Sequence, residues 1–474
     1  MRITRKQSLP VHIALAGILS LNLVACGEDR TGEFVEQTGD THWIYDVMKE
    51  NYLWYKEMPV LNNYSSYFSE PEPFFNSLLS KKDRFSYIEV QDDSQLSATR
   101  SSAASVSYGF EFVLYGDITG ESKRLFARVL YVLPDSPAEA AGLKRGDWIA
   151  DVGGQYLTED NYGMLLSGGA TTLTLMQLNY EKLDSIYWES EMRRLPIGAA
   201  RYVEDNPFLV DSVYQLHGHR IAYLMYNSFS TGPDNNPTDK EYGNQMRQIF
   251  AAFKSQHPTD FVLDLRYNPG GYLSCAQTLA SLLTPQRAFG KVFCSLEFSD
   301  KKSKDNESIL LSESLTGGNN LDLSKLYVIV GEQTASASES IINGLIPYIG
   351  AENIVLVGAK TVGKNVASIS YEQAEYGITM HPIVATVYNG LGESDYANGF
   401  TPYVELDEFQ FIDNYQPLGS TDEILLNTVL HMILYGDDEL QMQQATRSVL
   451  PMKSPFFNSV SLHRPACLLT KVDI

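Results

Sequence analysis

The sequence has 474 residues, of which 44% are hydrophobic and 11% aromatic, and its formal net charge is −22 at pH 7. A chain of this length exceeds what one hydrophobic core can organise, so we expect two or three domains. The excess of carboxylates would repel the phosphates of a nucleic acid, which argues against a nucleic-acid partner. The charge leaves the substrate class open.

The first 26 residues follow the order of features found in an export signal. Three basic residues precede an apolar run and a small-residue cleavage site, namely Arg2, Arg5 and Lys6, then Val11 to Leu19, then Leu23-Val24-Ala25. The run is too short for a transmembrane helix, so we predict a signal peptide over residues 1–25. With Cys26 next, the segment resembles the bacterial lipoprotein signal. A plain secretory signal is the alternative.

The resemblance to a lipoprotein signal implies that Cys26 is lipidated and becomes the mature N-terminus. A lipid anchor would then hold the protein in the cell envelope, at the outer membrane, facing either the periplasm or the outside. Residues 27–30 are similar to the export tag of surface lipoproteins in Bacteroidetes. We interpret the polar residues 26–40 as a tether.

The other cysteines are Cys275, Cys294 and Cys467, and they lie far apart in the sequence. Their spacing matches no metal site, and the eight histidines form no paired motif. We therefore predict no metal ion and no cofactor. One disulfide or none is expected.

The first half of the chain predicts two small domains. Residues 41–100 carry apolar side chains at helical spacing, which predicts an N-terminal helical domain. Residues 105–180 contain short strands around one helix, and the segment 136–149 resembles a PDZ domain of the bacterial type. Tyr108, Gly109 and Phe110 resemble the carboxylate-binding loop of that domain. The resemblance implies that this loop binds the free C-terminus of a peptide that adds a strand to the sheet edge. A generic α+β insert is the alternative.

Within a predicted domain of residues 200–436, buried strands and helices alternate from Ile221 to Gly358, which predicts an α/β sheet with its loops at one end. One strand, Phe261 to Leu265, leads into Asn268-Pro269-Gly270-Gly271, where glycine lets another backbone or a substrate carbonyl approach closely. A second strand, Ile354 to Gly358, leads into the loop Ala359 to Val366. The final residues 437–474 form a tail without a clear pattern.

The stretch Leu326 to Ser340 reads as a strand, a sharp turn and a helix. A serine at such a turn has its hydroxyl lifted to the sheet edge, beside backbone amides that have no acceptor within the helix. Both features suit a nucleophile and an oxyanion site. The alternative is that the serines and Glu339 only cap the helix.

Several motifs in a fixed order resemble the carboxyl-terminal processing (tail-specific) serine protease family. They are Leu263 to Arg266 with Asn268 to Gly271, Thr334 to Glu339, and Thr361 to Lys364, all behind the PDZ-like segment. The resemblance implies an α/β fold with a ClpP/crotonase-like catalytic core, an inserted PDZ domain and a small N-terminal helical domain.

Carried over by motif, Ser336 is the nucleophile and Lys364 the general base. The oxyanion would be held by the amide of Ala337 with that of Gly270 or Gly271. Lysine accepts a proton only when it is neutral, and burial favours the neutral form of an amine. The sequence also contains a rival base, Lys360, and two rival nucleophiles, Thr334 and Ser338.

Two departures from the family pattern concern the base. The separation of Ser336 from Lys364 is longer than is usual in the family, and Ser368 stands where the family often has a glutamine that orients the lysine. Ser368 is therefore a possible orienting residue.

Together these features predict a metal-independent serine endopeptidase. Its partners would be proteins or peptides recognised by their C-terminal tail. A peptide-binding envelope lipoprotein whose catalytic machinery has decayed is the alternative function. An acyl-CoA enzyme on the same core would have no reason to carry a PDZ domain or a secretion signal.

Overall fold

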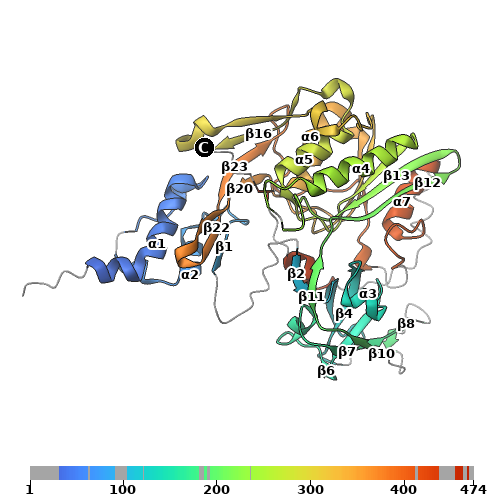
Figure 1. The fold of residues 1–474 in the computed structure, drawn as a ribbon, viewed down its shortest axis with the longest axis horizontal. Helices are drawn as coiled ribbons and strands as arrows, with labels where there is room; N and C mark the ends of the chain where they lie inside the picture. Colours follow the sequence, from blue (N-terminus) through green and yellow to red (C-terminus); the bar gives the residue numbers. More distant parts are fainter. Residues whose placement is uncertain are drawn as a thin grey trace, which may run out of the picture.

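The computed structural model describes residues 31–61, 64–90, 104–120, 122–180, 186–188, 193–234, 236–410, 415–436, 454–462 and 467–468. The predicted signal peptide and Cys26 lie outside these residues. Figure 1 shows an N-terminal region in blue, a large core above and to the right, and a smaller β-rich region in cyan and green below it. None of the described helices combines the length and apolarity needed to cross a membrane.

The N-terminal region contains two helices and one strand, which are α1 (Thr31–Asn51), α2 (Pro71–Leu78) and β1 (Tyr87–Val90). Apolar side chains three or four positions apart put one face of each helix into a shared core. These side chains are Ile44, Met48, Phe74, Phe75 and Leu78, and Tyr52, directly after α1, joins them. The same core includes Ile378 and Met380 of β22 (Ile378–His381), a strand that pairs antiparallel with β1.

Two expectations for this region were wrong. The predicted tether included residues 31–40, but these residues belong to α1. Thr38 and Thr41 are fully buried there, and the Thr41 hydroxyl lies 2.6 Å from the carbonyl oxygen of Tyr67, so the polar side chains are satisfied inside the fold. The region is also not purely helical, because β1 completes a sheet with strands from the far end of the chain.

The core is built on a six-stranded sheet. Its strands, in spatial order, are β12 (Phe208–Leu216), β13 (His219–Tyr226), β14 (Asp260–Asp264), β18 (Leu326–Val330), β19 (Ile354–Gly358) and β24 (Val404–Glu405). The first two form an antiparallel hairpin, and every later pair is parallel. The carboxyl ends of β14 and β18 are therefore neighbours, which brings the loops that follow them together.

Both faces of this sheet are covered. Three helices pack on one face, namely α4 (Glu241–Ser255), α5 (Leu273–Leu283) and α6 (Ala337–Ile349). The helix α7 (Ile424–Tyr435) packs on the other face. Because alternate residues of a strand point to opposite faces, Leu263 and Val328 join the three-helix side. Val262 and Ile329 join the α7 side, where side chains of the predicted PDZ domain also pack. The burial of both faces explains the continuous apolar strands in the sequence.

A second sheet crosses the core beside the loops. It consists of β15 (Gly271–Tyr272), β26 (Cys467–Leu468), β20 (Val366–Ser368), β23 (Ile383–Tyr388), β16 (Val292–Phe298) and β17 (Glu307–Leu310) in that order. Strand β26 comes from the last residues of the chain, which carried no strand signal.

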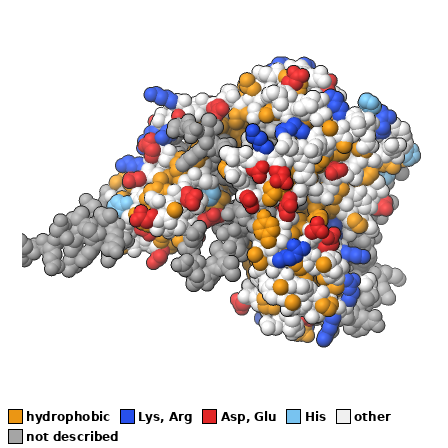
Figure 2. Space-filling view, viewed as in Figure 1, with side chains coloured by type: hydrophobic (Ala, Val, Ile, Leu, Met, Phe, Trp, Pro, Cys, Tyr) orange, Lys and Arg blue, Asp and Glu red, His pale blue; other side chains and the backbone are white. Residues whose placement is uncertain are grey.

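The predicted PDZ domain, called the PDZ region below, is a seven-stranded sheet with a short helix, α3 (Pro137–Ala141). The order is β10 (Arg193–Ile197), β7 (Thr171–Met176), β5 (Trp148–Val152), β4 (Leu125–Val132), β3 (Phe110–Gly116) and β25 (Phe457–Asn458), with β6 (Gln155–Tyr156) beside β5. A ribbon of β2 (Ala104–Ser107) and β11 (Arg201–Glu204) leads back to the core. On the face drawn in Figure 2, acidic and basic side chains of the described residues are interspersed over both regions.

Candidate active site

Ser336 lies at the sharp turn between β18 and α6. It is the N-cap of the helix, with φ of 62° and ψ of −113°, a backbone conformation that non-glycine residues rarely adopt. Its side chain is fully buried, and its Oγ, which faces the backbone N–H of Glu339 in a capping box, has no other hydrogen-bond partner. A strained turn that presents a hydroxyl without an acceptor for its proton is typical of a nucleophile.

The neighbouring hydroxyl groups serve the turn itself. Thr334 Oγ1 donates to the carbonyl oxygen of Leu265 at 2.8 Å, and Ser338 Oγ donates to that of Asn268 at 3.0 Å. Ser340 Oγ donates to the carbonyl oxygen of Ser336 at 3.1 Å. These bonds tie the turn to the end of β14 and distinguish Ser336 from its rivals.

Glu339 joins the turn to the loop that carries Lys364. Its carboxylate accepts the backbone N–H of Ser336 at 2.9 Å, which is one half of the predicted helix cap. The same carboxylate accepts the backbone N–H groups of Gly363 and Lys364, both at 2.7 Å, and the Thr361 hydroxyl at 2.6 Å. Because one Oε2 atom binds both Ser336 and Lys364, their backbone nitrogens lie within two hydrogen-bond lengths of each other.

Glu339 is fully buried. Burial raises its pKa, whereas the hydrogen bonds from Thr361, Ser336, Lys364 and Gly363 act in the opposite direction. From the sequence, Glu339 was predicted only to cap the helix. Its second role depends on a loop more than twenty residues away, which local pattern does not reveal.

The two candidate bases differ in burial. Lys364 is 1% exposed, whereas Lys360 is exposed at the surface. The Nζ of Lys364 lies 5.5 Å from the centre of the Phe85 ring, so an aromatic residue of the N-terminal region covers one side of the amine. Arg84 beside it donates to the carbonyl oxygens of Gly363 and Ala397 at 3.2 and 2.6 Å. Sequence reasoning missed both N-terminal contacts.

The candidate oxyanion donors lie around the same turn. Ala337 is the first residue of α6, where backbone amides have no acceptor within the helix. The Gly270 amide donates to Asn268 Oδ1 at 2.9 Å, so it is already engaged. Gly271 has φ of 139°, and a Cβ there would collide with the Phe229 carbonyl. Of the two alternatives from the sequence, this geometry favours Gly271.

Ser368, the possible orienting residue, is buried at the end of β20, the strand that follows the Lys364 loop. The PDZ loop residues Tyr108, Gly109 and Phe110 are also buried. The Gly109 amide donates to Ser107 Oγ at 3.2 Å, and the Tyr108 hydroxyl donates to the Gly169 carbonyl at 2.7 Å. In this conformation the Gly109 amide therefore has an internal acceptor.

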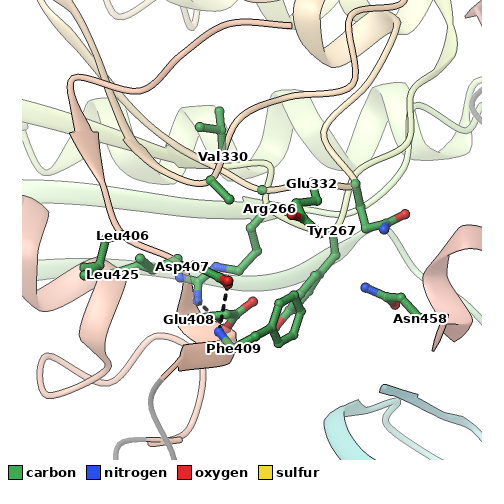
Figure 3. A pocket seen from close by; sticks show the side chains of 13 residues that line it. Arg266, Tyr267, Val330, Glu332, Leu406, Asp407, Glu408, Phe409, Leu425 and Asn458 are labelled. Carbon is green, nitrogen blue, oxygen red and sulfur yellow. Dashed lines mark hydrogen bonds and ion pairs between the residues drawn. The ribbon is translucent and has the colours of Figure 1, made fainter. Parts of the chain in front are cut away.

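A buried charge network lies at the end of β14. Arg266, directly after β14, donates to both oxygens of Glu423 at 2.8 and 2.9 Å and to Asp264 at 2.7 Å. Arg145 of the PDZ region donates to Glu408 at 2.7 Å, and Arg266 reaches the same carboxylate at 3.3 Å. Figure 3 shows Arg266 and Glu408 beside a pocket whose far side is formed by Asn458. The network connects the PDZ region to the core sheet.

The described residues contain no cluster of metal-ligating side chains and no disulfide bond. No group of three or more His, Cys, Asp or Glu side chains converges there as a metal site. Cys275 is a free thiol, and burial raises its pKa to about 12, which makes it a poor nucleophile. The side chain of Cys467 lies outside the description.

Three family models match successive parts of the chain. The model described as peptidase family S41 matches residues 220–406, the peptidase S41 N-terminal domain matches residues 41–87, and a PDZ domain matches residues 128–178. The first match includes Ser336, Lys364 and Gly271.

A solved structure extends the likeness over the full architecture. The crystal structure of a putative S41 protease from Bacteroides fragilis is 33% identical, covers 84% of this chain and 98% of its own, and superposes with a TM-score of 0.74. The chain belongs to peptidase family S41. The predicted family and the predicted α/β fold with PDZ and N-terminal domains are therefore confirmed.

Curated members of the S41 family are more distant. A carboxyl-terminal-processing protease of Picosynechococcus is 26% identical over 323 residues, which cover 67% of this S41 chain and 69% of the relative. The carboxy-terminal processing protease CtpA of Bacillus subtilis is 26% identical over 285 residues, which cover 59% of this chain and 53% of the relative. These relatives agree with the predicted serine protease class.

Proposed function

We propose that this S41 peptidase cleaves peptide bonds through Ser336, with Lys364 as its general base. The observation that carries the proposal is the Ser336 hydroxyl, which has no acceptor for its proton and is held at a strained turn whose backbone shares the Glu339 carboxylate with Lys364. A shared anchor fixes the two segments relative to each other, and fixed geometry is what a nucleophile and its base require.

The chemistry follows from these groups. The neutral amine of Lys364 takes the proton of Ser336 Oγ as the oxygen attacks the carbonyl carbon of the scissile bond. The amides of Ala337 and Gly271 would hold the oxyanion, and each donor would stabilise the transition state by about 3 kcal/mol. Lys364 then protonates the leaving amine, and a water molecule attacks the acyl-enzyme with Lys364 again as base. No metal takes part in these steps.

The substrates would be proteins or peptides whose free C-terminal tail binds the PDZ region. PDZ domains bind extended peptides by adding them as a strand to a sheet edge, through backbone hydrogen bonds, and this mode of binding suits an unstructured tail. Ser336 and Lys364 are 0% and 1% exposed, so a substrate must displace part of the fold to reach the hydroxyl.

A small fluorophosphonate tests the nucleophile. It should label the full-length protein at Ser336, because only an activated serine reacts at a useful rate. Labelling should become faster as pH rises and the amine loses its proton, and a chelator should not change it. Ser336→Ala should abolish labelling, whereas Ser340→Ala should leave it, because Ser340 Oγ only bonds the Ser336 carbonyl. Absence of labelling in folded protein would favour the decayed peptide-binding lipoprotein.

We also propose that the protein is anchored in the envelope through a lipid on Cys26, on the strength of the signal sequence alone. The mature protein should begin at an acylated Cys26 and fractionate with membranes, and Cys26→Ala should release or mislocalise it. Intact-mass analysis of the purified protein checks this. An unmodified N-terminus at another residue would contradict the anchor.

A further inference from the structure

The edge of β3 in the PDZ region is covered by the chain's own C-terminal segment, residues 456–460. Phe457 and Asn458 pair antiparallel with Leu114 and Val113, and the Phe456 amide donates to the Leu114 carbonyl at 3.1 Å. This is strand addition, the mode by which such domains bind extended peptides. The segment runs along β3 toward the predicted carboxylate-binding loop, the direction in which a peptide would present its C-terminus there.

Side chains of the segment also fit the region as a ligand would. The Phe457 ring packs between Phe112 of β3 and Tyr162 of the short helix η3 (Tyr162–Leu165), with ring centres 6.0 and 4.7 Å away. Two residues later, Ser459 Oγ accepts the Phe112 amide at 2.9 Å and donates to the Glu111 carboxylate. Ser459 is fully buried, whereas the neighbouring Phe456 is 52% exposed.

The same end of the chain also reaches the catalytic loops. Strand β26 lies between β15 and β20, with Cys467 opposite Gly271 and Leu468 opposite Ser368. Gly271 is the favoured oxyanion donor, and Ser368 closes the strand that begins two residues after Lys364. The C-terminal residues therefore occupy both the β3 edge, where a peptide would bind, and the position between β15 and β20, beside the proposed catalytic groups.

We propose that residues 456–460 are an intramolecular ligand of the PDZ region that competes with substrate tails. The tails that compete best would carry an aromatic residue, packed against Phe112 and Tyr162, and a serine or threonine two positions later, bonded to Glu111. Release of the segment would free the β3 edge and loosen β26 beside Gly271. The proposal rests on the proposed peptidase function only where activity is the readout.

A binding experiment tests the proposal without catalysis. A fluorescent peptide of residues 454–462, Ser-Pro-Phe-Phe-Asn-Ser-Val-Ser-Leu, is titrated against full-length Ser336→Ala protein, alone and combined with Phe457→Ala and Ser459→Ala. If the segment fills the edge more than nine-tenths of the time, releasing it should tighten peptide binding by at least about tenfold. Phe456→Ala is the matched control and should behave like the parent, because that side chain points to solvent. A peptide with alanine at both anchor positions should not bind.

Activity gives an independent second readout. In protein with an intact Ser336, the released variant should cleave a long tailed peptide with a lower KM. Thermal unfolding shows whether each variant is folded. Equal peptide binding by released and parent protein, or none by either, would overturn the intramolecular ligand. Failure of fluorophosphonate labelling with peptide binding intact would instead overturn the proposed function.

Discussion

Replacing Lys364 by arginine should reduce kcat/KM on a tailed peptide nearly as much as replacing it by alanine, by at least about 10³-fold. Arginine keeps the charge and approximate length, but it cannot give up its proton and so cannot accept one from Ser336. In the parent enzyme kcat/KM should rise with pH to a plateau as the amine becomes neutral. Both arginine and alanine variants should lose that rise.

Two comparisons make the assignment of the base specific. Lys360→Ala is the matched control and should retain activity close to that of the parent, because Lys360 is exposed while Lys364 is buried. Since nucleophile and base act as a unit, Ser336→Ala combined with Lys364→Ala should be scarcely worse than either change alone. Substantial activity in Lys364→Ala together with loss in Lys360→Ala would transfer the role of base to Lys360.

Arg266→Met should destabilise the core by about 3–5 kcal/mol at pH 7, because it leaves buried carboxylates without their cation. Arg266 is 1% exposed and binds Asp264, Glu408 and Glu423. Hydrogen exchange of the β14 amides measures the loss, since it reports local opening in a chain of several domains. Lys56→Met is the control, because the Lys56–Asp300 pair is exposed to solvent and should contribute little to stability.

The contribution of Glu423 to the pH dependence of stability has a definite sign. Burial alone would raise the pKa of Glu423, but Arg266 and then Arg145 lower it to about 2. A carboxyl group with a lowered pKa adds stability above its ordinary pKa, here 4.5, and the contribution disappears as pH falls toward 2. The parent should lose protection in this window, whereas Arg266→Met should not. Equal acid sensitivity of both proteins would contradict the role given to Arg266.

The parts of the site that the sequence predicted are those encoded by short motifs. The strand-to-helix turn at Ser336 and the Gly270-Gly271 pair follow from apolar periodicity and from the conformational needs of glycine, which are local properties. The structure adds burial, which separates Lys364 from Lys360, and hydrogen bonding, which separates Ser336 from Thr334 and Ser338.

The parts that could not be predicted depend on contacts between distant segments. Glu339 resembles a helix-capping residue in the sequence, and only the folded chain places Gly363 and Lys364 on its carboxylate. The two strands of the tail are only two residues long, so neither shows a periodicity, and each exists because a sheet edge is available. The wrong tether has the same cause, since buried threonines look polar in a sequence.

The pairing of β1 with β22 affects how the protein is made. Tyr87 finds its partner, His381, about 290 residues later in the chain, which corresponds to roughly 15–60 s of synthesis at about 5–20 residues per second. Until then the apolar face of α1 and α2 lacks Ile378 and Met380, so the N-terminal region cannot complete its core before β22 has been synthesised. The N-terminal region therefore stays incomplete during most of synthesis, and its fold depends on a segment from the second half of the chain.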